Sequence, residues 1–231
     1  MDIIAINKWL KKYKVSNYTI NEDLSVDVEG DVDLYKKSLI VIPIRFRNVS
    51  GKFRCDSNML VNLEGCPEHV SGDFYCGNNQ LSSLFGGPEH VGGNFGCDGN
   101  QLTSLEGCPK NVGGFFKCNN NKLTSLIGCP SEIISNFSCS ANNLLTLEGG
   151  PISVRGFFSC TDNKELYSLE MCPKVVGGRF YCGNNGLDST EYFLVKCSVE
   201  EIGQYYEKKN LHIDLGKLEV VSGLDIKKKK I

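Results

Sequence analysis

A 21-residue period dominates the sequence and constrains its fold more than any other feature. A phenylalanine opens each unit, a cysteine follows it by two positions, and an asparagine follows the cysteine by three, as in Phe95, Cys97 and Asn100. The shared pattern is F-x-C-x-x-N-x-L-x-x-L-E-G-C-P-x-x-V-x-G-x. A fixed period of this length indicates a repeat solenoid, in which each unit buries its apolar side chains only against its neighbours.

The pattern continues beyond its strictest copies. One extra residue enters after Asn163, so the last unit starts at Phe180, and a degenerate copy with Val32 and Leu34 precedes Phe53. We therefore expect eight turns over residues 31–187. The first of them has Lys37 where the others have asparagine.

Each turn offers a short alternating strand, Phe-x-Cys, whose first and third side chains point to the same side. Stacked turns then place equal residues about 4.8 Å apart in a parallel sheet. We expect the phenylalanines and cysteines to form the core and the asparagine amides to point inward, where they can satisfy backbone groups of the tight turn. The frequent Gly and Pro of the return arm favour an irregular path or a short tight helix.

The segment F-x-C-x-x-N-x-L resembles the second half of the leucine-rich repeat, L-x-x-L-x-L-x-x-N-x-L, with Phe and Cys in the two strand positions. The proline at each bend is similar to that of the short bacterial class of these repeats. The opening WLKKY and the bend E-G-C-P resemble small repeat proteins of large tailed phages and some bacteria. The resemblance implies a right-handed coil with a parallel β-sheet on its concave face, irregular return arms and a cap at each end.

Three regions follow. Residues 1–30 are expected to form an N-terminal cap, with a helix around Trp9 and a hairpin of Tyr18–Ile20 with Leu24–Val28. Residues 31–187 are the solenoid. Residues 188–231 are expected to form a C-terminal cap with a helix after Ser198 and a solvated basic tail, Lys227–Lys230.

The cysteines and histidines predict structure rather than chemistry. The sequence has 12 cysteines but no CxxC, and the column before the bend proline accepts glycine in their place. We interpret the cysteines as small buried apolar residues rather than as disulfides or metal ligands. The sequence has 3 histidines and no G-x-S-x-G, H-E-x-x-H, P-loop or Rossmann motif. We therefore expect no enzyme activity, no cofactor and no metal.

Charge and hydropathy restrict the partners. The sequence has 25 Lys+Arg and 27 Asp+Glu, whereas nucleic-acid binding favours a basic surplus. Nothing in the sequence approaches the roughly 18 consecutive apolar residues of a membrane span, so we expect no membrane partner. The many cysteines and an N-terminus unlike a secretory signal favour a reducing, cytoplasmic location, the host cytoplasm if a phage encodes the protein.

The side chains flanking the core columns vary from turn to turn, and we expect function there, on the concave face. Aromatic and arginine side chains are enriched at protein interfaces. The candidate protein-binding residues are Arg54, Tyr75, Phe115, Lys117, Phe157, Arg179 and Tyr181.

The leading hypothesis is a non-enzymatic scaffold that binds another protein, for a phage protein a host defence factor. The alternative is a structural or self-assembling component. A weaker alternative is nucleic-acid binding through the basic tail and the basic residues of the face. An exposed pair of phenylalanines on alternate turns is suggestive of an interface, although Phe115 and Phe157 could also be covered by their own loops or by self-association.

Overall fold

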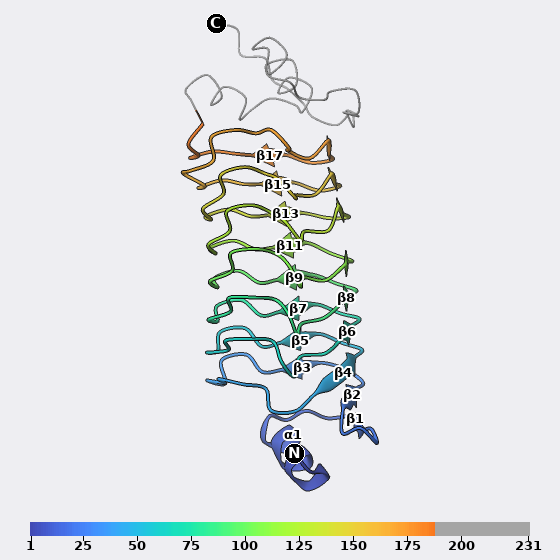
Figure 1. Cartoon of the computed structure of the whole chain (residues 1–231). Helices are drawn as coiled ribbons and strands as arrows, with labels where there is room; N and C mark the ends of the chain where they lie inside the picture. Colours follow the sequence, from blue (N-terminus) through green and yellow to red (C-terminus); the bar gives the residue numbers. More distant parts are fainter. Residues whose placement is uncertain (188–231) are drawn as a thin grey trace, which may run out of the picture.

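The computed structural model describes residues 1–187, and the expected C-terminal cap and its basic tail lie outside the described residues. The described chain is a β-solenoid (Figure 1). Its main sheet has eight parallel strands that pair strictly in sequence order. The strands are β3 (Val32–Asp33), β5 (Phe53–Arg54), β7 (Phe74–Tyr75), β9 (Phe95–Gly96), β11 (Phe116–Lys117), β13 (Phe137–Ser138), β15 (Phe158–Ser159) and β17 (Phe180–Tyr181).

The return arm carries further strands that the sequence did not predict. After the bend proline of each turn, the return arm contributes a short strand to a second ladder of parallel strands. This ladder is interrupted after β10, so its strands belong to two sheets. These strands are β4 (Phe46–Val49), β6 (His69–Val70), β8 (His90–Val91), β10 (Asn111–Val112), β12 (Glu132–Ile133), β14 (Ser153–Val154) and β16 (Val175–Val176). Because the turns stack in register, even a strand of two residues has a hydrogen-bonding partner in the neighbouring turn.

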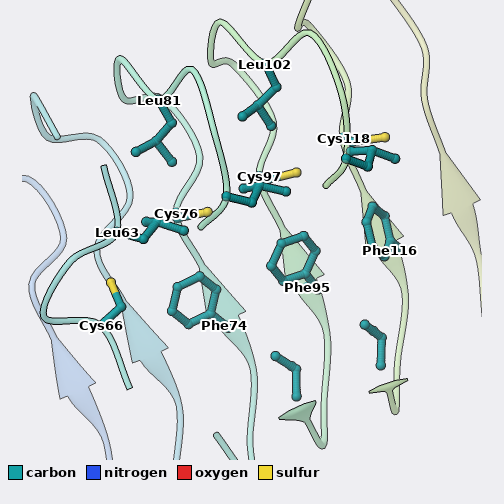
Figure 2. Packing of buried hydrophobic residues seen from close by; sticks show 14 of the residues in the cluster. Leu63, Cys66, Phe74, Cys76, Leu81, Phe95, Cys97, Leu102, Phe116 and Cys118 are labelled. Atoms are coloured by element: carbon teal, nitrogen blue, oxygen red, sulfur yellow. The ribbon is translucent and has the colours of Figure 1, made fainter. Parts of the chain in front are cut away.

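The phenylalanine and cysteine columns form the core, as predicted (Figure 2). Phe95 and Cys97 have no exposed surface, and neighbouring phenylalanine rings stack along the axis. The ring centroids of Phe74 and Phe95 are 6.0 Å apart with planes 8° from parallel. Leucines from each turn, such as Leu102, close the core from the other side.

The asparagine column joins neighbouring turns through backbone hydrogen bonds, which confirms its inward placement. Asn79 Nδ2 donates to the carbonyl oxygens of Cys76 in its own turn and Cys55 in the preceding one, both at 3.0 Å. Its Oδ1 accepts from the backbone N–H of Leu60 at 3.0 Å. Asn100, Asn121 and Asn142 repeat this arrangement, so each buried amide is hydrogen-bonded on both sides.

Two positions in each turn adopt left-handed backbone. The position before the core asparagine has a positive φ in every turn from Ser57 to Asn184. The residue type at this position varies and includes glycine (Gly99) and alanine (Ala141). The corner after the second leucine is also left-handed and takes glycine from Gly65 to Gly149, but Met171, with φ 64°, in the last arm. A non-glycine residue in this conformation is strained by its Cβ.

A helix and a hairpin precede the first turn. Helix α1 (Ile3–Lys12) begins after Asp2, whose side chain accepts from Ala5 N at 2.8 Å. Strands β1 (Tyr18–Ile20) and β2 (Val26–Val28) pair antiparallel, and β2 also pairs in parallel with β4 of the second ladder. The second hairpin strand therefore starts at Val26 rather than at Leu24, whose φ is 63°.

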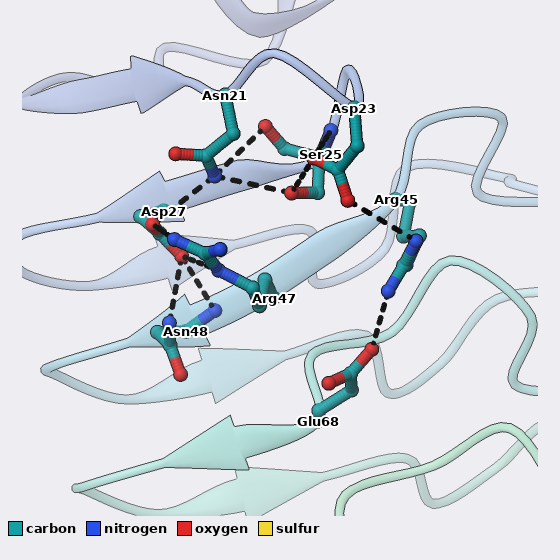
Figure 3. Close-up of polar contacts among 8 residues, drawn as sticks. All are labelled: Asn21, Asp23, Ser25, Asp27, Arg45, Arg47, Asn48 and Glu68. Carbon is teal, nitrogen blue, oxygen red and sulfur yellow. Dashed lines mark hydrogen bonds and ion pairs between the residues drawn. The ribbon is translucent and has the colours of Figure 1, made fainter.

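Asp27 joins the hairpin to the first return arm (Figure 3). Its carboxylate accepts from the Arg47 guanidinium, from Asn48 Nδ2 at 2.8 Å and from Asn21 Nδ2 at 3.1 Å. The Arg47 hydrogen bonds, with smaller contributions from Asn21 and Asn48, lower the pKa of Asp27 to about 2 although partial burial opposes them.

Candidate protein-binding surface

The outward-pointing residues of the main sheet form one surface, here called the strand face. Strand alternation produces it: because the first strand residue and the cysteine point into the core, the residues before, between and after them point out. All seven predicted candidates lie in these outward positions. Arg54, Tyr75, Lys117 and Tyr181 stand between Phe and Cys, and Phe115, Phe157 and Arg179 precede the phenylalanine.

Tyr75 and Phe115 come from turns that are not adjacent, yet their rings meet. Their centroids are 6.3 Å apart with planes tilted by 40°. Gly96 occupies the turn between them, and a Cβ there would lie 2.9 Å from Cδ1 of Tyr75. The glycine thus leaves room for the tyrosine ring to lie across its turn.

A hollow of about 270 Å³ opens beside this pair. Four of the predicted candidates line it: Arg54, Tyr75, Phe115 and Lys117. The rest of the lining is charged and consists of Lys52, Asp56 and Asp98. Burial raises the pKa of Tyr75, as does the nearby Asp73 carboxylate, although a hydrogen bond with Asn94 opposes them. The phenol therefore stays neutral near neutral pH.

The basic candidates at this hollow already have acidic partners. Arg54 binds Asp56 through two nitrogens, Nε to Oδ1 at 3.1 Å and Nη2 to Oδ2 at 3.0 Å. Lys117 Nζ lies 3.5 Å from Asp98 Oδ2. These carboxylates, which the sequence interpretation left out of the site, compensate the positive charge of the hollow.

A second hollow, of about 260 Å³, lies between Phe115 and Phe157. Its polar lining includes Asn119, Asn136 and Ser138, and Ser138 Oγ donates to Asn119 Oδ1 at 2.7 Å. Phe115 thus contributes to both hollows. The two hollows are therefore adjacent, and each is lined by both aromatic and polar side chains.

Phe157 and Tyr181 continue the aromatic surface towards the last turn. Their centroids are 5.9 Å apart with an interplanar angle of 75°, and they are 36% and 39% exposed. Arg179 is exposed and makes no ion pair with any other residue of the described range 1–187. The structure therefore brings six of the candidates into two connected groups and places Arg179 in the column of Phe157, one turn farther on.

The cysteines of the strand column are buried. Burial raises the pKa of Cys97 and Cys118 well above the ordinary value. Within residues 1–187, no group of three or more His, Cys, Asp or Glu side chains is arranged to hold a metal ion. His69 and His90 are neighbours in the second ladder, with ring centroids 5.2 Å apart and planes tilted by 36°.

Searches for related proteins match no family model, no curated protein and no solved structure. In the part of the chain that the structure describes, no helix has the length and apolar character of a membrane span.

Proposed function

We propose that the chain is a non-enzymatic scaffold that binds a partner protein on the strand face, with Phe115 and Phe157 at the centre of the contact. The observation that carries this proposal is the position of the two phenylalanines in their column. Elsewhere in that column, Asp73 and Asn94 accept hydrogen bonds at 2.9 Å from the backbone N–H of the equivalent residue one turn later. A phenylalanine cannot do this, and its ring instead adds apolar surface to the face.

The hollows suit an apolar or aromatic anchor side chain from the partner. Aromatic residues that line shallow pockets are frequent energetic centres of protein interfaces. The ion pairs of Arg54 and Lys117 favour a partner segment that is close to neutral, and they disfavour a nucleic-acid backbone, which would have to compete with Asp56 and Asp98.

We favour binding over catalysis. A cysteine nucleophile needs thiolate character, and burial opposes it at Cys97 and Cys139 of the strand column. The buried free thiols are also compatible with the reducing cytoplasm inferred from the sequence. The likeness to leucine-rich repeats of the short bacterial and tailed-phage type extends the proposal: the partner would be a host protein, such as a defence factor that the chain inhibits.

Affinity capture from a bacterial lysate, with the full chain as bait, tests the assignment of the face. The test variant combines Tyr75→Ala, Phe115→Ala, Phe157→Ala and Tyr181→Ala. The matched control is Ile152→Ala, which removes an exposed apolar side chain from the return arm. We expect the wild type and the control to retain a protein that the test variant loses; equal recovery by all three baits would show that the partner binds elsewhere.

A further inference from the structure

Exposed apolar side chains also gather on a side of the coil that the proposed function does not use. This side is formed by the L-x-x-L-E-G segments of successive turns. Six of its residues are between 46% and 65% exposed and are here called the apolar stripe: Ile40, Val61, Phe85, Ile127, Leu145 and Tyr167. Exposed apolar residues that gather on one side in this way mark an interaction site more often than scattered single residues do.

Successive turns are in register along this side as well. Met59 N donates to Leu39 O at 2.8 Å, and Gln101 N donates to Leu81 O at 2.9 Å. Each stripe position therefore repeats at the spacing of one turn, about 4.8 Å.

The order of apolar and polar residues along the stripe is the same from either end of the coil. At the position of Val61, the seven successive turns carry two apolar residues, three polar ones and two apolar ones: Ile40, Val61, Ser82, Thr103, Thr124, Leu145 and Tyr167. At the position three residues later, Phe85 and Ile127 lie one turn on either side of Glu106. The first row is therefore symmetric in polarity about the fourth turn, that of Thr103 and Glu106. The second row has the same symmetry from Glu64 to Glu148, whereas its ends differ, with Pro43 and Glu170.

We propose that two copies of the chain associate through the apolar stripe, with antiparallel axes, about a two-fold axis that passes through the fourth turn. Such an axis places Ile40 opposite the partner's Tyr167. It likewise places Val61 opposite the partner's Leu145 and Phe85 opposite the partner's Ile127. An isologous interface forms each of these contacts twice, which requires this end-to-end symmetry of the surface.

The available area suits a dimer. Seven turns span about 29 Å along the axis, and a six-residue segment spans at most about 20 Å across it, the length of a fully extended chain. The projected surface therefore has an upper limit of roughly 600 Å² per copy and about 1,200 Å² for the pair, which is the size of a small, reversible interface.

The glutamates of the same side determine the salt dependence. The two-fold axis brings Glu106 opposite its own copy and Glu64 opposite the partner's Glu148. Like charges at short range repel, and salt screens that repulsion. The dimer should therefore tighten as the salt concentration rises, and Glu106→Gln should tighten it at low salt.

Sedimentation velocity on the full chain, over a range of concentrations, tests the proposal through a charge-pair exchange. Phe85→Lys alone and Ile127→Glu alone should each weaken dimerisation at least tenfold. The double variant places each new lysine opposite a new glutamate of the other copy and should restore the dimer. Both side chains are exposed, so neither change disturbs the core, and circular dichroism would verify the fold of each variant.

Each outcome decides the proposal. A wild type that stays monomeric at about 100 µM would overturn it. So would a dimer that both single variants leave unchanged, and failure of the double variant to restore a weakened dimer would exclude the antiparallel register. Phe157→Ala, on the strand face, should leave the dimer intact, so this test succeeds or fails independently of the proposed function.

Discussion

The side-chain amide of Asn100 donates a hydrogen bond to the carbonyl oxygen of Cys76, 24 residues earlier, at 3.1 Å. The same amide bonds Cys97 O in its own turn, and its Oδ1 accepts from Leu81 N. One buried side chain thus holds together the backbones of two turns. The column it belongs to is the main polar element inside an otherwise apolar core.

Replacement of this amide should be costly. Asn100→Ala removes the side-chain partner of Leu81 N and of two carbonyl oxygens, and we expect a loss of about 3 kcal/mol in the free energy of unfolding. Urea unfolding followed by circular dichroism would measure it. Asn143→Ala, at an exposed position, is the control and should change stability by less than about 0.5 kcal/mol. Similar values for the two variants would contradict the structural role of the asparagine column.

The strand-column thiols should be unreactive until the protein unfolds. Cys97 is fully buried, and burial raises its pKa, so thiolate forms rarely and reagents cannot reach it. We expect iodoacetamide at pH 8 to leave Cys97 unmodified in the native protein and to modify it fully in guanidinium. Peptide mass spectrometry would follow the modification. Rapid labelling of native Cys97 would show that the core opens readily.

Substitutions at the left-handed corner should change stability in opposite directions, because one removes a Cβ and the other adds one. Met171 has φ 64° and is exposed, so Met171→Gly should relieve backbone strain and stabilise the protein by about 1 kcal/mol. Gly107→Ala should destabilise it by about 2 kcal/mol, because φ is 81° and the new Cβ would lie 2.7 Å from Phe85 N. Thermal unfolding would compare both with the wild type. Destabilisation by the Met171 change would indicate that its side chain has a packing role.

The ionised side chain of Asp27 should make the free energy of unfolding depend on pH in the acidic range. Its folded pKa is about 2, below the ordinary 3.8, so folding favours the ionised form. The corresponding stability is complete above about pH 5 and is lost as the pH falls through 2. Asp27→Asn should therefore cost about 1–2 kcal/mol at pH 7 and much less at pH 2. Urea unfolding at both values would check this, with the exposed Glu22→Gln as control; an Asp27→Asn effect equal at both pH values would rule out the ion pair as its cause.

The columns of the core could be predicted because each repeats in every turn. Phe95, Cys97 and Asn100 each have equivalents one period away, and stacking alone then determines their environment. The second ladder could not be predicted in this way. A strand of two residues such as His69–Val70 is too short to show alternation, and only the neighbouring turns stabilise it.

The positions of the surface residues could be predicted from the sequence, but their ion pairs could not. Outward placement of Arg54 and Lys117 follows from alternation along the strand. Their pairing with Asp56 and Asp98 depends on side-chain conformation, which the repeat pattern does not determine. The apolar stripe did have a sequence signal, the replacement of glutamate by Phe85 and Ile127 on alternate turns, in a part of each unit outside the Phe-x-Cys strand.

Because the same bonds connect every turn to the next, from Asn79 to Asn142, the molecule can change length in whole units. Duplication or deletion of one complete 21-residue segment preserves all remaining bonds and only lengthens or shortens the column. Gene-level gain and loss of units can therefore alter the separation between distant surface groups in fixed steps. A single extra residue, like the one after Asn163, is absorbed within its own turn, because Phe180 still pairs with Phe158.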